Sequence, residues 1–97
     1  MFTATEEQIA QWKEKHGTVH EITVGDKKAY LKKLDRKSVS LALTFLGKDF
    51  LKFGETIATN NWLDGDKEIY EDGETAASFS EAVSDIVNGQ KAEYVKH

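Results

Sequence analysis

The chain has 97 residues, of which 39% are apolar and 31% are charged, and its formal net charge is −4. This length predicts one domain over 1–97, with an ordered core over about 5–89 and fraying over 90–97. The composition excludes wholesale disorder, the apolar stretches fall far short of the roughly 20 residues of a membrane-spanning helix, and the negative charge argues against nucleic acid as the main partner.

The first predicted element is a short amphipathic helix. Thr5 and Gln8 have the spacing of a capping box, in which each residue satisfies a backbone amide at the start of a helix. Apolar residues then recur on one helical face until Gly17, a residue type that commonly ends helices. We therefore expect a helix over about 6–16.

A β-hairpin is predicted next. The segments 18–24 and 27–34 alternate in polarity and flank Gly25-Asp26, whose leading glycine suits a two-residue turn. When the two residues beside the turn are paired, one face of the hairpin becomes apolar and the other mostly polar. The apolar face, which helices must cover, holds Ile22, Val24, Ala29 and Leu31.

Two helices are predicted after the hairpin. Asp35 is a suitable N-cap for a helix with a wide apolar face that ends near Gly47. Asp49 can cap a third helix, in which apolar residues recur at spacings of three and four up to Trp62. Within it, Gly54 is expected to let a neighbouring element approach closely.

The remaining chain is predicted to be a loop followed by one more helix. The polar stretch 64–73 has the composition of a loop, and apolar residues in 74–88 recur with the period of a helix that Gly89 can end. The fold class is therefore α+β, with an N-terminal helix, one β-hairpin and about three further helices in a single compact domain.

No metal or cofactor site is expected. The carboxylates of 64–68 alternate as in a calcium loop, but Ile69 stands where the turn requires glycine and Thr75 stands where a glutamate should close the site. His16 and His20 are separated by a helix end, so they do not share one helical face. Cysteine is absent, which removes disulfides and thiolate ligands.

No catalytic residue is expected either, so the chain is interpreted as a non-enzyme. Its serines lie in helical patterns rather than in a nucleophile elbow. The alternative function is a small nucleic-acid-binding or adaptor module that uses a basic hairpin, because cationic residues interleaved with Tyr30 could follow a phosphate backbone. These residues are Lys27, Lys28, Lys32, Lys33, Arg36 and Lys37.

The apolar content between Val39 and Leu63 is the strongest functional signal from the residues themselves. Eleven of these twenty-five positions hold large apolar side chains. They either form the core or leave an apolar surface for a protein partner. The candidate partner-binding residues are Leu41, Phe45, Phe50, Phe53 and Trp62.

About half of the chain, roughly 19–70, resembles the small tail assembly chaperones of tailed phages and prophages. The resemblance lies in the order of the elements and in four stretches, Tyr30-Leu31-Lys32-Lys33, Asp35-Arg36, Phe53-Gly54-Glu55 and Asn61 to Ile69. It implies a non-enzymatic protein that coats the long tape measure protein and helps to recruit tail-tube subunits. The N-terminus has no secretory signal pattern, so we expect the protein in the cytoplasm of a bacterial host.

Overall fold

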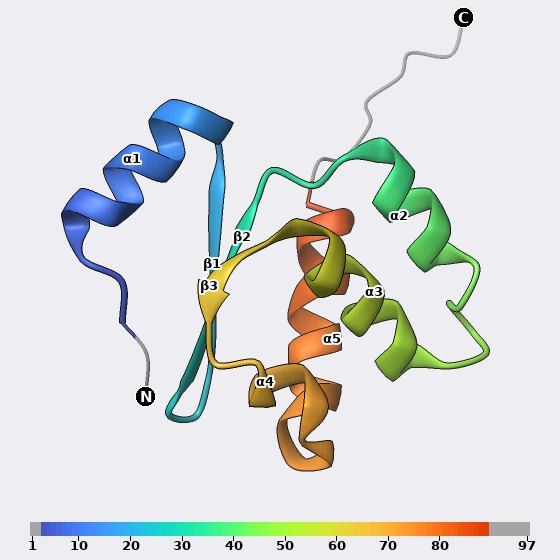
Figure 1. Cartoon of the computed structure of the whole chain (residues 1–97). Helices are drawn as coiled ribbons and strands as arrows, with labels where there is room; N and C mark the ends of the chain where they lie inside the picture. The colour runs from blue at the N-terminus through green and yellow to red at the C-terminus, as the bar shows by residue number, and fades with distance from the viewer. Residues whose placement is uncertain (1–2, 90–97) are drawn as a thin grey trace, which may run out of the picture.

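A computed structural model describes residues 3–89 of the chain (Figure 1). The fraying expected over 90–97 lies outside these residues. The elements in chain order are α1 (Glu6–His16), β1 (Val19–Val24), β2 (Lys27–Lys32), α2 (Arg36–Leu43), α3 (Phe50–Asn61), β3 (Trp62–Gly65), α4 (Glu68–Glu71) and α5 (Gly73–Val87). The α+β class is confirmed.

Short polar side chains start the first three helices, as predicted. The Gln8 amide donates to Thr5 Oγ1 at 3.1 Å and the Thr5 amide donates to Gln8 Oε1 at 2.9 Å, which completes the capping box of α1. Asp35 accepts from the Ser38 amide at 2.6 Å, and Asp49 accepts from the Lys52 amide at 3.1 Å. Each cap satisfies an amide that has no partner inside its helix.

The hairpin has the predicted register. Val24 pairs with Lys27 and Ile22 pairs with Ala29, in antiparallel β1 and β2. The face that was expected to be mostly polar differs from the prediction at Tyr30, which is completely buried. Its ring lies 5.5 Å from that of Trp12 on α1, and its hydroxyl donates to Glu21 at 2.7 Å and accepts from the Ala4 amide at 3.2 Å.

The prediction of a loop over 64–73 was wrong. Residues Trp62–Gly65 form β3, which pairs antiparallel with β2, and Glu68–Glu71 form the short helix α4. Gly65 allows this pairing, because its φ is 137° and a Cβ there would lie 2.9 Å from the Cα of Ala29. The sheet order is β1-β2-β3, so β2 is its central strand.

The sheet separates α1 from the other helices, as Figure 1 shows, with α1 on one side and α3, α4 and α5 on the other. The core lies between the sheet and this second group. Its buried residues are Ile22, Ala29, Leu31, Ala42, Phe53, Ile57, Ala58, Ile69, Phe79 and Val83. Gly54 of α3 contacts α5 closely, because a Cβ at this position would lie 2.9 Å from Ser80 Cα.

The second helix is shorter than predicted. It ends at Leu43 rather than near Gly47, and residues 44–48 form a turn that leads to α3. Thr44 contributes to this ending, since its hydroxyl donates to the Leu41 carbonyl at 2.7 Å. The start of α2 is tied to the end of α3, where buried Asn61 donates to Ser38 Oγ at 2.9 Å.

Candidate functional site

Five large apolar side chains are exposed where α2 ends and α3 begins. Their exposed fractions lie between 39% and 51%. They belong to the last turn of α2, the connecting turn and the first turn of α3, and we call this group the α2–α3 tip. Its members are Leu41, Leu43, Leu46, Phe50 and Leu51. Large apolar side chains that remain exposed are candidates for contact with a partner.

The backbone of the α2–α3 tip is held by its own hydrogen bonds. The amides of residues 44 to 46 donate to carbonyls three residues earlier, and those of Lys48 and Asp49 both donate to the Phe45 carbonyl. The Asp49 cap then starts α3. The apolar side chains are therefore carried on a turn that is ordered by five backbone hydrogen bonds.

Phe50 is the best supported side chain of the tip. Its ring stacks on that of Phe53, with 5.9 Å between the centroids and 5° between the planes. Phe53 is 1% exposed and belongs to the core, whereas Phe50 is 39% exposed. The core thus holds one face of Phe50 in place, which reduces the entropy that this side chain would lose on binding.

The structure divides the five predicted partner-binding residues. Leu41 and Phe50 are exposed in the tip, and Phe45 is half-buried beside them against the core. Phe53 is buried, so the folded surface does not present it. Trp62 begins β3 at the far end of α3, where it is half-buried and its ring meets Tyr70 edge to face at 5.6 Å.

Three residues of the tip were not among the predicted ones. In the sequence, Leu43 and Leu46 continue the apolar stripe of the predicted second helix, and this pattern assigns them to the core. The helix ends at Leu43, however, so the later residue leaves the stripe and turns to solvent. Leu51 follows Phe50 directly, and the sequence has no signal that separates it from the core positions of α3.

The basic hairpin is partly neutralised by neighbouring carboxylates. Lys27 pairs with Asp26 at 4.0 Å, and Lys28 pairs with Glu21 at 3.7 Å. Tyr30, the ring that could have stacked on a base, is covered by α1 and hydrogen-bonded through its hydroxyl. Lys32, Lys33, Arg36 and Lys37 are the remaining cations of this set.

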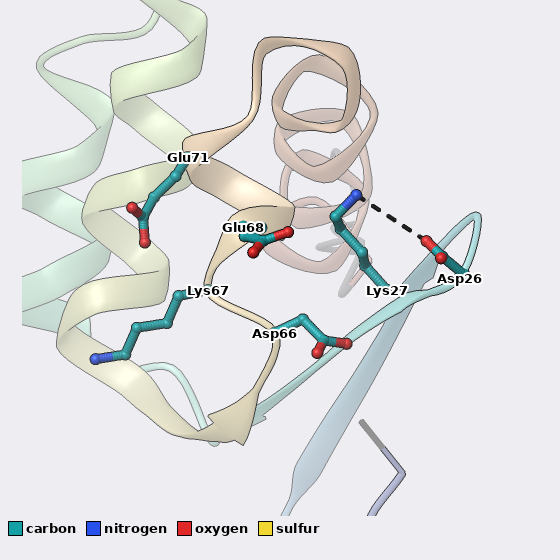
Figure 2. A pocket seen from close by; sticks show the side chains of 6 residues that line it. All are labelled: Asp26, Lys27, Asp66, Lys67, Glu68 and Glu71. Atoms are coloured by element: carbon teal, nitrogen blue, oxygen red, sulfur yellow. Dashed lines mark ion pairs between the residues drawn. The ribbon is translucent and has the colours of Figure 1, made fainter. Parts of the chain in front are cut away.

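The acidic segment that follows β3 borders a hollow of about 580 Å³ on the side of the hairpin turn. Figure 2 shows Asp26 and Lys27 on one side of this hollow and Glu68 and Glu71 on the other. The Asp66 carboxylate accepts a hydrogen bond from the Lys28 amide at 3.0 Å, and this bond connects the segment after β3 to β2. Across residues 3–89, no group of three or more side chains of the metal-binding types is placed to hold an ion.

The two histidines lie beside different hollows. His20 borders one lined largely by apolar residues, and His16 borders a neighbouring basic one. Burial lowers the pKa of His20 below its ordinary 6.5.

None of the described helices is both long and apolar enough to cross a bilayer.

Comparison of the chain with protein-family models, with curated proteins and with solved structures found no match.

Proposed function

We propose that this protein is a non-enzymatic binding module whose α2–α3 tip holds the apolar face of a helix in an elongated protein partner. The observation that carries the proposal is the exposure of five large apolar side chains on one ordered helix-turn-helix segment. A partner that covers this apolar surface stabilises the complex by about 25 cal/mol for each Å² of apolar area removed from water.

A helical partner suits the tip better than an extended one. The turn amides from Thr44 to Leu46 and at Lys48 and Asp49 are bonded internally, so these amides are not free to pair with an added strand. An added β-strand needs unpaired backbone groups on its receptor, whereas a helix satisfies its own. Residues three and four apart on such a helix form the apolar stripe that would meet the tip.

The resemblance to tail assembly chaperones supplies a specific candidate for this partner. We propose the tape measure protein of the same phage or prophage, with the tail-tube protein as a second partner, in the cytoplasm of the bacterial host. An assembly chaperone of this kind must shield long apolar helices until they are packed. The exposed side chains of the tip have the chemistry for that task.

The test is co-expression with the tape measure protein encoded in the same genome. Wild type should keep the tape measure protein soluble and co-purify with it. The variant Leu46→Ser/Leu51→Ser should lower the affinity at least about tenfold, since a desolvated anchor contributes ~1–3 kcal/mol. Phe45 is a poorer probe, because its side chain also packs against the core.

A matched control keeps the test specific. The variant Ala10→Ser/Ala77→Ser changes two exposed positions on α1 and α5 and should bind like wild type. Circular dichroism should show that all three proteins are folded. The proposal fails if the tape measure protein stays insoluble with wild type, or if the tip variant rescues it equally well.

A further inference from the structure

A concave surface lies at the end of α2 opposite to the α2–α3 tip. Two adjoining hollows of about 300 and 390 Å³ share Lys33 and Leu34 as a common wall. They are bordered by the end of α1, the start of β1, the end of β2, the start of α2 and the end of α5, all of which lie in the upper half of Figure 1. We call these two hollows together the β2–α2 groove.

The floor of the β2–α2 groove is aliphatic. Four apolar residues line it, all of them half-buried and packed against the core from the outside. They are Leu34, Val39, Ile86 and Val87. Since the core fixes them on one side and the other side borders the hollow, they form a preformed seat for one bulky apolar side chain.

The rim of the groove carries an excess of cations, of which Lys32 also acts electrostatically on Asp35. Lys32, Lys33 and Arg36 border it, and within residues 3–89 none of them forms an ion pair. The carboxylate on the rim is that of Asp35, and it accepts the Ser38 amide at 2.6 Å as the cap of α2. By contrast, Lys27, Lys28 and Lys52 are each paired with a carboxylate.

We infer that the β2–α2 groove binds a short segment of a partner protein in which carboxylates flank a bulky apolar residue. The apolar side chain would occupy the floor, and the carboxylates would pair with Lys33 and Arg36, where guanidinium geometry favours carboxylate recognition. Among the described residues the rim has three cations, Lys32, Lys33 and Arg36, and one carboxylate, that of Asp35, and this excess of positive charge on a protein with a net charge of −4 gives the charge complementarity that selects an acidic segment. This surface is separate from the α2–α3 tip, so the inference does not rest on the proposed function.

Nucleic acid fits the same groove less well. Single strands are bound by a positive groove together with aromatic rings on which the bases stack. No Phe, Tyr or Trp side chain lines the groove, whose rings are the imidazoles of His16 and His20, and Tyr30 of the adjacent strand is buried under α1. The phosphates of a nucleic acid would pair with the rim cations, but the nucleic acid would leave the aliphatic floor exposed to solvent.

The test uses the full chain and a library of random peptides of about twelve residues, selected on wild type and counter-selected on Lys33→Glu/Arg36→Glu. Both substituted residues are exposed, so the variant should fold. Enriched peptides should contain at least two carboxylates beside a bulky apolar residue. A synthetic enriched peptide should lose at least about tenfold in affinity for wild type when its carboxylates are replaced by amides. The unmodified peptide should bind Lys33→Glu/Arg36→Glu at least about tenfold more weakly than wild type.

The control Lys48→Glu/Lys67→Glu makes the same change in net charge at exposed positions outside the groove, and it should keep the affinity of wild type. In NMR spectra, the bound peptide should shift the signals of Val39 and Ile86 and leave those of Leu46 and Phe50 in place. Shifts at the tip instead would overturn the groove assignment without touching the proposed function.

Three other results would overturn the inference. The first is that no enriched peptide distinguishes wild type from Lys33→Glu/Arg36→Glu. The second is that the enriched peptides carry no excess of acidic residues. The third is that a single-stranded oligonucleotide of about twenty nucleotides binds with the same dependence on Lys33 and Arg36 while the peptides do not, which would make the rim a phosphate site.

Discussion

His20 is a titratable side chain placed against an apolar surface. It pairs with Leu31 across the hairpin and borders the aliphatic floor of the β2–α2 groove. Burial disfavours its charged form, so its pKa is lower in the folded protein than the ordinary 6.5. The unfolded chain therefore takes up a proton first as the pH falls.

This difference predicts a loss of stability on mild acidification. Above pH 6.5 His20 is neutral in both states and has no effect on the free energy of unfolding. As the pH falls through 6.5, the unfolded state is stabilised by protonation, and the loss continues until the folded-state pKa has been passed. Urea unfolding at about pH 7.5 and about pH 5.5 should show a larger decrease for wild type than for His20→Gln.

Asp35 does not interfere in that pH range. The Ser38 amide bonded to its carboxylate holds the pKa of Asp35 below the ordinary 3.8. Its contribution is present above 3.8 and is lost only as the pH falls further through the folded-state pKa. Parallel decreases for wild type and His20→Gln would therefore mean that the pKa of His20 does not differ between the folded and unfolded states.

Single side chains were predictable where their role is local. Thr5, Asp35 and Asp49 could be identified as helix caps because each bonds an amide three residues ahead. Tyr30 could not be placed correctly, since its position in the alternation predicts a solvent-facing side chain. Its burial depends on Trp12 and the Ala4 amide, which reach it only after the N-terminal segment has folded across the sheet.

The crossing of α3 and α5 depends on the missing side chain of Gly54. A Cβ there would collide with Ser80, so Gly54→Ala forces the two helices apart. Alanine favours a helix by about 1 kcal/mol over glycine, but overpacking a tight contact costs about 1–3 kcal/mol. We expect a net loss of unfolding free energy, measured by chemical denaturation.

Gly73 provides the matched control for this prediction. It is also a helical glycine, at the start of α5, but a Cβ there would meet nothing within 4 Å. Gly73→Ala should therefore leave the stability unchanged or raise it slightly. If both substitutions were stabilising, the close contact between α3 and α5 would be refuted.

Elements with a strong period were predictable, and elements defined by distant partners were not. The period-two alternation and the turn fixed the register of β1 and β2. The four residues of β3 are too few to show an alternation, and they are a strand only because β2 offers its second edge. The acidic composition around α4 favoured a loop, although Ile69 within it is fully buried.

The candidate site could be located from the sequence to a segment but not to a surface. Composition marked 39–63 as unusually apolar, and that segment supplies both core and tip. Phe50 and Phe53 are three residues apart and stack on each other, yet one is exposed and the other is buried. Only the packing of α3 against α5 and the sheet decides which of the two faces solvent.

The β2–α2 groove was beyond the reach of sequence patterns. The basic residues near the hairpin exit were visible, but the apolar residues that form its floor come from the loop after β2, from α2 and from α5. Ile86 and Val87 are remote from Leu34 in the chain. Their proximity is a result of the fold as a whole.

The assembly of the sheet has a consequence for the rate of folding. The β1–β2 pairing joins neighbouring segments, whereas α2 and α3 separate β2 from β3 in the sequence. Leu31 of β2, for example, pairs with Trp62 of β3. Closing the longer loop costs more chain entropy before any contact repays it. We therefore expect the rate-limiting barrier to be crossed with the hairpin formed and β3 still undocked.

Asp66 reports on this order of events. Its carboxylate accepts the Lys28 amide, and its own amide donates to the Lys28 carbonyl at 2.8 Å, so Asp66→Ala weakens the docking of β3. In stopped-flow experiments this variant should unfold faster and refold at nearly the rate of wild type. A refolding rate that falls in proportion to the lost stability would instead place the docking of β3 before the barrier.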